Sequence, residues 1–262
     1  MKQRIITGII LIALFVPIVL YGGAPFTVLV YALASVGLYE LVRMKKLPVI
    51  SVPTVLTAVL LWLILIPSKA TGIFEAIRLS KVEVTFVIVL LLLSYTVISK
   101  NTFTFDDASF LLMSTIYVAM GFYYLNETRI EGLIYIFYTL LVIWATDTGA
   151  YFIGRAIGKR KLWPEISPNK TVEGAIGGIV CAVVIAIIYN AFQPVSDNVA
   201  ALIGVTIGVS AFGQIGDLVE SAFKRHYGVK DSGKILPGHG GILDRLDSLL
   251  FVLPLLHFLH FI

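Results

Sequence analysis

The chain has 262 residues, of which 58% are hydrophobic and 14% are charged, and its net charge is +4. A soluble domain carries about 25% charged residues, so this composition excludes an ordinary soluble domain. The apolar runs are continuous rather than alternating in steps of two, which indicates membrane-spanning helices and excludes an outer-membrane β-barrel. The basic residues lie in short loops instead of on one domain face, so nucleic acid is not an expected partner.

The first apolar run follows a basic start and extends from Ile5 to about Tyr21. Signal peptides begin in the same way, but this run is long for their apolar core. We therefore interpret it as a first membrane helix that the mature chain retains. Together the apolar runs predict an all-α polytopic membrane protein with about nine transmembrane helices. The expected spans are 5–22, 26–43, 52–68, 83–100, 108–125, 132–154, 173–193, 198–223 and 242–262.

The loops between these spans carry basic residues unevenly. With a cytoplasmic N-terminus, sixteen of the 20 Lys and Arg residues fall on the cytoplasmic side. Because cytoplasmic loops carry the excess of basic residues, this distribution predicts a multi-pass protein of the inner (plasma) membrane with its N-terminus inside. The loop 155–171 and the segment 221–247 then share the cytoplasmic face, where soluble nucleotides are available.

The two halves of the chain differ in character. Residues 1–130 form spans expected to serve packing, lipid access and dimer contacts, whereas acids and glycines concentrate in 131–262, the expected catalytic region. Glu40 is an acid embedded in the first half, and its neighbour Arg43 favours a place near the membrane interface without a functional role. The chain shows no internal repeat, which argues against a secondary transporter.

Asp147 follows a long apolar run, and an acid so far into a span is usually functional. The alternative is an aspartate that is hydrogen-bonded to neighbouring helices. Cys181, the single cysteine, lies within another apolar run and is interpreted as a buried small hydrophobe.

The loop 155–171 is basic. Its Arg155–Lys161 cluster is interpreted as an anchor to anionic lipid headgroups. The next string, Ser167-Pro168-Asn169-Lys170-Thr171, predicts a phosphate site. Ser167 or Asn169 is expected to cap the following helix, and a helix N-terminus beside a lysine binds anions.

Small residues recur at a spacing of four in Gly174-x-x-x-Gly178 and Gly204-x-x-x-Gly208. Such faces allow close helix packing within or between protomers, so a homodimer is consistent with them. For Gly174, Gly177 and Gly178 we favour packing over the approach of a ligand.

Asp217 and Glu220 are three residues apart and share a helix face, and Lys224 lies one turn beyond Glu220. A salt-bridged helix end would explain Glu220 and Lys224. Asp217, however, lies about one turn inside the apolar run, and a surface ion pair does not explain an acid at that position.

The segment 221–247 is the densest polar stretch of the chain. Asp244 and Asp247, again three apart, open the last apolar run, and two carboxylates on one face repel each other unless a cation lies between them. Mg²⁺ usually takes one or two carboxylates together with substrate phosphates, so a metal site is predicted; the alternative is that both acids complement the helix dipole. Arg245 is expected to point away from this pair, and His239 to contact a phosphate or a base edge.

A longer pattern in this segment resembles the signature of the phosphatidate cytidylyltransferases. It reads Ser221-x-Phe223-Lys224-Arg225, four residues, Lys230-Asp231-x-Gly233, two residues, and Leu236-Pro237-x-His239-Gly240-Gly241-Ile242-x-Asp244-Arg245-Leu246-Asp247. The string from Ser167 to Gly174 and the Asp147 region are also similar to that family.

The resemblance implies that CTP and phosphatidic acid react to CDP-diacylglycerol and pyrophosphate with Mg²⁺. A second cation such as K⁺ is compatible with the same centre, but the sequence does not show it. It implies a metal site at Asp217, Asp244 and Asp247, joined by Asp147. These three aspartates are expected to be catalytic, together with Lys224 and Arg225, whose cations suit phosphate. The residues expected to bind substrate phosphate are Ser167, Asn169, Lys170, Thr171, Lys230, Lys234, His239, Gly240, Gly241 and Arg245.

Other functions remain open on the residues alone. A CTP-dependent polyprenol or lipid kinase would use similar groups but release CDP instead of pyrophosphate. A cation-coupled transporter would use the four aspartates as an ion path, and a membrane scaffold would leave the charged segment unexplained.

Overall fold

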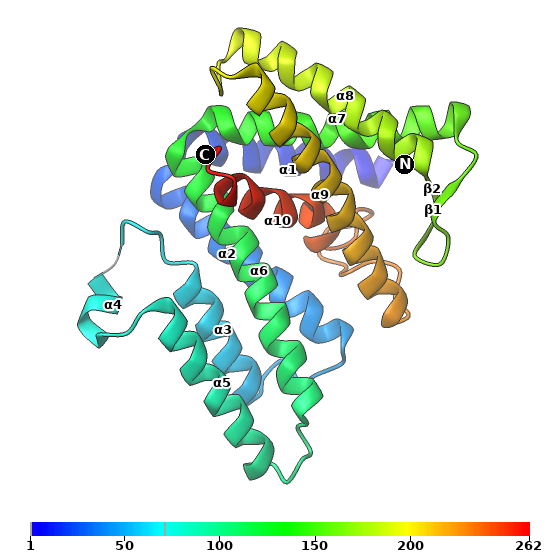
Figure 1. Cartoon of the computed structure of the whole chain (residues 1–262). Helices are drawn as coiled ribbons and strands as arrows, with labels where there is room; N and C mark the ends of the chain where they lie inside the picture. The colour runs from blue at the N-terminus through cyan, green and yellow to red at the C-terminus, as the bar shows by residue number, and fades with distance from the viewer. Residues whose placement is uncertain (1, 71) are drawn as a thin grey trace. The chain divides into compact units, whose positions relative to one another are not determined.

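The computed structural model describes residues 2–70 and 72–262 (Figure 1). The helices and strands are α1 (Lys2–Tyr21), α2 (Gly23–Met44), α3 (Val52–Ile64), α4 (Gly72–Ile77), α5 (Lys81–Ile98), α6 (Phe105–Glu131), α7 (Leu133–Ile157), β1 (Lys161–Trp163), β2 (Ser167–Thr171), α8 (Val172–Phe192), α9 (Val199–His226) and α10 (Leu243–Phe258). Each predicted span contains a helix, so the all-α class is confirmed. The short helix α4 and the β1–β2 hairpin were not predicted.

Six of the described helices are long and apolar enough to cross a membrane, namely α2, α5, α6, α7, α8 and α9. Helix α3 has 13 residues and α10 has 16. At 1.5 Å per residue both are shorter than a hydrocarbon core of about 30 Å. A multi-pass membrane protein is therefore supported, and the count of nine spans stays a prediction.

The chain forms two compact units, each described here by itself. The first comprises Met1–Glu127 and Ser232–Ile242, and the second comprises Thr128–Asp231 and Leu243–Ile262. The predicted division at residue 130 concerned function and stays a prediction. The structure nevertheless groups Ser232–Ile242, which that division assigned to the C-terminal region, with the N-terminal helices.

In the first unit, helices α2, α3 and α5 pack through apolar side chains that are almost fully buried, among them Ala34, Leu61 and Leu92. Local signals set the helix starts. The Ser51 side chain accepts a hydrogen bond from the Thr54 N–H at the start of α3, and Ser80 and Glu83 form a capping box at the start of α5.

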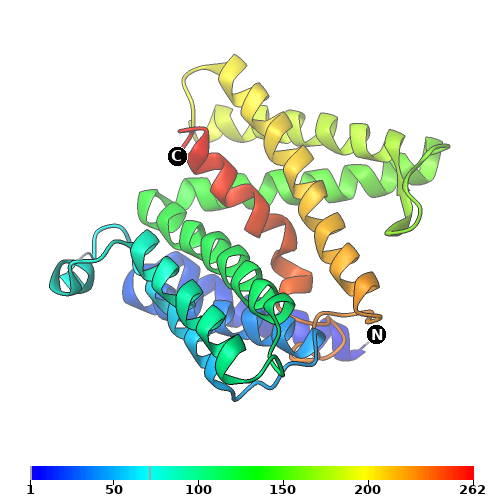
Figure 2. The ribbon, with the colours of Figure 1, turned by 60° about the horizontal axis from the view of Figure 1, so that its bottom comes forward.

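In the second unit, α7 and α8 run side by side (Figures 1 and 2). Their glycines allow this approach, because a Cβ added at Gly178 would lie 2.6 Å from the Thr146 carbonyl oxygen and one added at Gly174 would lie 2.7 Å from that of Ala150. The predicted packing role of these glycines is confirmed within the chain. An added Cβ at Gly204 meets no described heavy atom within 4 Å.

Helices α9 and α10 complete the core of the second unit. Tyr138 of α7 is fully buried, and its hydroxyl lies 2.8 Å from the Thr206 hydroxyl of α9. The Ser248 hydroxyl of α10 donates to the Gly213 carbonyl oxygen of α9 at 3.0 Å. These contacts hold the stretches of α7, α9 and α10 that carry acidic residues.

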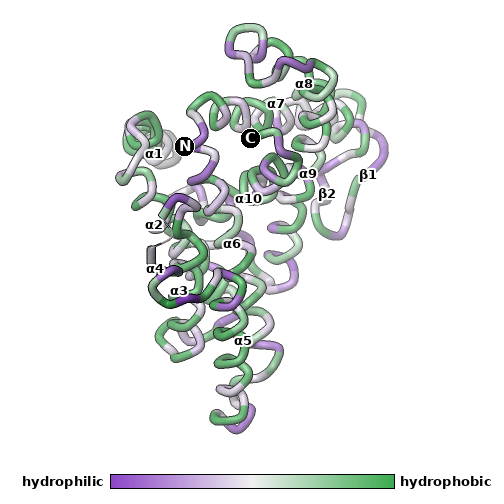
Figure 3. The backbone as a smooth tube through the Cα atoms, turned by 60° about the vertical axis from the view of Figure 1, so that its left-hand side comes forward, coloured by the Kyte–Doolittle hydropathy of each residue, from purple (hydrophilic) through white to green (hydrophobic). Residues whose placement is uncertain are grey.

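The hairpin of β1 and β2 is antiparallel, with Lys161 opposite Thr171 and Trp163 opposite Ser167. It is one of the hydrophilic stretches between the apolar helices (Figure 3). Helix α8 is capped by Thr171, whose Oγ1 accepts from the Gly174 N–H at 3.1 Å. The expectation that Ser167 or Asn169 caps this helix is wrong, because both lie in the extended strand that ends at Thr171.

Candidate functional site

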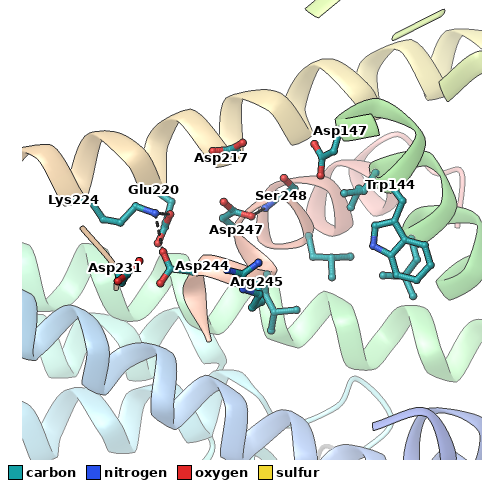
Figure 4. A pocket seen from close by; sticks show the side chains of 14 residues that line it. Trp144, Asp147, Asp217, Glu220, Lys224, Asp231, Asp244, Arg245, Asp247 and Ser248 are labelled. Atoms are coloured by element: carbon teal, nitrogen blue, oxygen red, sulfur yellow. Dashed lines mark hydrogen bonds and ion pairs between the residues drawn. The ribbon is translucent and has the colours of Figure 1, made fainter. Parts of the chain in front are cut away.

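Four aspartates from three helices line one cavity of about 630 Å³ in the second unit (Figure 4). Asp147 comes from α7, Asp217 from α9, and Asp244 and Asp247 from the beginning of α10. The i, i+3 spacing places Asp244 and Asp247 on one face of α10, as the sequence predicted. The structure therefore brings together all four residues predicted to surround a cation.

The same cavity contains further charges. Glu220 and Asp231 add two acids, and Lys224 and Arg245 are the basic residues of its lining. Arg245, which was expected to point away from the carboxylates, thus lines the cavity with them. Six acids against two bases give the lining an excess of acidic side chains, whose oxygens are the kind of ligand that hard cations take.

Lys224 joins two of the acids. Its Nζ lies 2.7 Å from Asp244 Oδ1 and also forms an ion pair with Glu220 Oε2. The side chains of Glu220 and Asp244 are only 3% and 6% exposed, so this is a buried charge cluster. The other carboxylate oxygen of Glu220 is buried and has no hydrogen-bond partner among the described residues.

A second cavity has a volume of about 520 Å³ and shares two of these aspartates with the first. Asp147 and Asp217 line both cavities, and the second is also lined by Asn169, Lys170 and Thr171 of strand β2. Lys170 Nζ lies 2.6 Å from Asp217 Oδ2, so the hairpin is linked to α9 by an ion pair. Predicted phosphate-binding residues and predicted metal ligands therefore meet at Asp217.

Other predicted site residues lie outside the linings of these two cavities. Ser167 pairs with Trp163 in the hairpin, and the exposed Arg225 donates from Nε to the Ile166 carbonyl oxygen at 3.3 Å. Lys230 lies exposed in the segment after α9. The remaining four belong to the first unit, and they are Lys234, His239, Gly240 and Gly241.

The donor set fits a hard divalent cation such as Mg²⁺. The carboxylates supply the oxygen ligands that Mg²⁺ prefers, and the unpartnered Glu220 oxygen offers another. Within the described residues, no three His, Cys, Asp or Glu side chains converge closely enough to hold a metal ion by themselves. Mg²⁺ usually binds through one or two carboxylates plus substrate phosphates, so a complete protein cage is not required.

Among the cavity residues that were not predicted site residues are Trp144, Glu220 and Asp231. Glu220 shares a face with Asp217, but a salt bridge to Lys224 explained it equally well from sequence. Asp231 lies within the signature and carried no separate signal. Trp144 lies one turn before Asp147, and an aromatic residue in an apolar run does not stand out.

With six described helices of membrane-spanning length, the chain is a polytopic membrane protein, and one of its cavities holds carboxylates beside lysine and arginine. The chain belongs to the cytidylyltransferase family, which it matches over residues 2–262. The resemblance found in the signature, and with it the prediction of an enzyme, is confirmed.

Its relatives are similar over almost their full length. The chain is 56% identical to the phosphatidate cytidylyltransferase of Bacillus subtilis (strain 168) over 262 residues, covering 99% of this chain and 97% of the relative. It is 53% identical to that of Staphylococcus haemolyticus (strain JCSC1435) and 52% identical to that of Staphylococcus aureus (strain COL), over 99% of this chain and 98% of each relative.

Proposed function

We propose that the chain transfers CMP from CTP to phosphatidic acid, giving CDP-diacylglycerol and pyrophosphate. The observation that carries this proposal is the charged cavity of the second unit, where Asp147, Asp217, Asp244 and Asp247 meet Lys224, in a chain with phosphatidate cytidylyltransferases among its relatives. The reaction needs groups that bind two phosphate-bearing substrates and a cation, and this lining supplies both kinds of group.

The chemistry needs no protein nucleophile. The phosphomonoester of phosphatidic acid has a second pKa of about 6, so it is largely dianionic near neutral pH and requires no general base. A lipid phosphate oxygen attacks the α-phosphorus of CTP in line, the bond to the bridging oxygen breaks, and its electron pair leaves with pyrophosphate. Catalysis then depends on positioning and on stabilising charge.

The residues of the site divide these tasks. Asp217, Asp244 and Asp247, with Asp147, would hold Mg²⁺, and a further cation such as K⁺ is compatible with the acid excess of the lining. When bound, Mg²⁺ supplies neutralisation of the triphosphate charge. Lys224 and Arg245 in one cavity, and Lys170 in the other, donate hydrogen bonds to phosphate oxygens.

The site is proposed to open to the cytoplasm of the cell, from the inner membrane. This orientation rests on the excess of basic residues in the loops expected on that side. It would give the enzyme soluble CTP from the cytoplasm and phosphatidic acid from the bilayer.

The testing experiment incubates purified protein in detergent with phosphatidic acid, Mg²⁺ and CTP labelled at the α-phosphate. The proposal expects label in a chloroform-soluble lipid and one pyrophosphate released for each lipid labelled. Label remaining in water as CDP would instead identify a CTP-dependent lipid kinase. Intact CTP with every lipid phosphate offered would contradict both enzymes and favour the transporter.

The absence of a covalent intermediate is tested separately. Direct attack by the lipid predicts sequential kinetics, with intersecting lines when both substrate concentrations are varied. A CMP–protein adduct, or the parallel lines of a ping-pong mechanism, would contradict it.

A further inference from the structure

Glu40 of α2 is a buried acid whose carboxylate binds both ends of one segment in the first unit. Its side chain is 1% exposed. Glu40 Oε2 accepts a hydrogen bond from the Ser232 hydroxyl at 2.9 Å, and Oε1 accepts one from the Ile242 N–H at 2.9 Å. From sequence, the neighbour Arg43 favoured a place near the membrane interface without a functional role, and that interpretation did not include these two hydrogen bonds.

The segment between these two contacts is a closed loop. The His239 N–H donates to the Leu236 carbonyl oxygen at 2.9 Å, across a turn with Pro237 second and Gly238, at a φ of 77°, third. This is the arrangement of a type II turn, in which the third residue needs a positive φ. The Leu236 N–H donates to the Gly240 carbonyl oxygen at 3.0 Å. Hydrogen bonds within the loop thus stabilise its tip, and those to Glu40 stabilise its base.

Two glycines of the segment let the backbone approach the carboxylate. A Cβ added at Gly233 or at Gly241 would overlap the Glu40 side chain. Both glycines belong to the signature, whereas Glu40 lies about 200 residues earlier and outside it. These two glycines of the signature therefore leave free the space that the Glu40 side chain occupies at the base of the loop.

We propose that Glu40 is a positioning residue that clamps the loop Ser232–Ile242 in the conformation needed for turnover. The inference rests on the proposed function, because Lys234, His239, Gly240 and Gly241 of this loop are expected to bind substrate phosphate. Glu40 acts through its hydrogen bonds to the loop, among them those from Ser232 and Ile242. Removing the Glu40 carboxylate takes one acceptor from the Ser232 hydroxyl and one from the Ile242 N–H. Buried polar groups that lose a hydrogen bond lower the stability of the folded state.

The test compares Glu40→Ala, Glu40→Gln and Ser232→Ala with a matched control, Glu127→Ala. Glu127 is 8% exposed and likewise accepts from a backbone N–H at 3.0 Å and a serine hydroxyl at 2.6 Å, both of Ser68. Ser68 carries none of the predicted substrate contacts. Glu40 and Glu127 thus accept the same kinds of hydrogen bond. They differ because Glu40 binds the loop with the predicted substrate contacts and Glu127 does not.

Two readouts are measured on each detergent-purified variant. We expect Glu40→Ala to lower kcat/KM for CTP about 10- to 100-fold, the scale of a misplaced binding group, and Ser232→Ala to lower it less. Glu40→Gln should keep most of the activity, because its amide oxygen accepts from Ile242 and its NH₂ group donates to the Ser232 hydroxyl. Trypsin should release a fragment that begins at Ile235 faster from Glu40→Ala and Ser232→Ala than from wild type or Glu127→Ala.

Failure of the clamp and failure of the proposed reaction give different results. If Glu40→Gln loses as much activity as Glu40→Ala, the carboxylate acts through its charge, and the clamp is overturned. Ser232→Ala removes a single hydroxyl. If this variant shows wild-type kinetics and wild-type cleavage at Lys234, the clamp is overturned as well. Wild-type protein that makes no CDP-diacylglycerol, with cleavage still accelerated in the variants, would reject the reaction and leave the clamp standing.

Discussion

At the scale of single residues, Lys224 is the charge on which the cavity depends. Its ammonium group lies between Glu220 and Asp244, two carboxylates that are almost fully buried. Without a cation between them these acids would repel each other at close range. In the proposed reaction, substrate phosphates would replace the carboxylates as partners of the Lys224 ammonium group. The bound cation would replace Lys224 as the partner of the carboxylates.

Replacing Lys224→Met should destabilise the folded protein, because it leaves Glu220 and Asp244 buried without their cation. Breaking a buried ion pair in this way costs about 3–5 kcal/mol. Thermal unfolding in detergent should show a clearly lower midpoint, and adding Glu220→Gln to the same chain should recover part of it. A midpoint equal to that of wild type in the single variant would contradict the buried cluster.

Asp244→Asn and Asp247→Asn should each remove most of the turnover while the protein stays folded. An amide keeps the shape of the carboxylate but lacks the charge that holds a divalent cation. Losing one group that stabilises transition-state charge lowers kcat about 10²- to 10³-fold. The label-transfer assay at millimolar Mg²⁺ measures the loss, size-exclusion chromatography is the control for folding, and retained activity would remove that aspartate from the metal site.

At the scale of helices, α7 packs closely against α8 and contributes lining residues to both cavities. Gly178 and Gly174 admit the backbone of α7, and Thr171 caps α8 directly beyond the hairpin. Lys170 is thereby fixed next to the helix start and reaches Asp217 on α9. The residues predicted to form an anion site at this helix N-terminus thus lie at the end of a strand, and the anion site itself stays a prediction.

Gly178→Val should destabilise the second unit, whereas Gly204→Val should not. At position 178 the added Cβ would lie 2.6 Å from a carbonyl oxygen, and at 204 it meets no described atom within 4 Å. Overpacking a close contact costs about 1–3 kcal/mol. Unfolding midpoints of both variants in detergent provide the comparison, and equal midpoints would show that the α7–α8 approach does not limit stability.

At the scale of the whole molecule, the expected orientation places most basic residues in the cytoplasm. Helix α5 is 18 residues long and of mean hydropathy 2.1, sufficient for a span. Lys69 and Lys100 lie on either side of it in the chain. If α5 crosses the membrane, these two lysines lie on opposite faces.

Cysteine labelling in whole cells tests this orientation. The background is Cys181→Ala, which removes the single cysteine, with Lys69→Cys or Lys100→Cys added. A membrane-impermeant maleimide should label position 69 in intact cells and position 100 only after the membrane is opened. The reverse pattern would invert the topology, and labelling of both positions in intact cells would show that α5 does not span.

The sequence by itself determined where the long apolar helices lie, which acids share a helix face and which family the signature indicates. Those properties depend on residues that are near neighbours in the chain. An apolar run of sufficient length predicts a helix wherever it packs, and a spacing of three predicts a shared face. Asp217 with Glu220, and Asp244 with Asp247, were therefore read correctly from spacing alone.

Only the tertiary structure decided which of these faces meet. The ion pair of Lys170 and Asp217 joins residues 47 apart, and the hydrogen bond from Ile242 to Glu40 joins residues 202 apart. No local pattern encodes such pairings, because they follow from how complete helices pack. For the same reason the hydrogen bonds of Glu40 could not be predicted from its neighbour Arg43, and the cap of α8 was expected at Ser167 or Asn169 instead of Thr171.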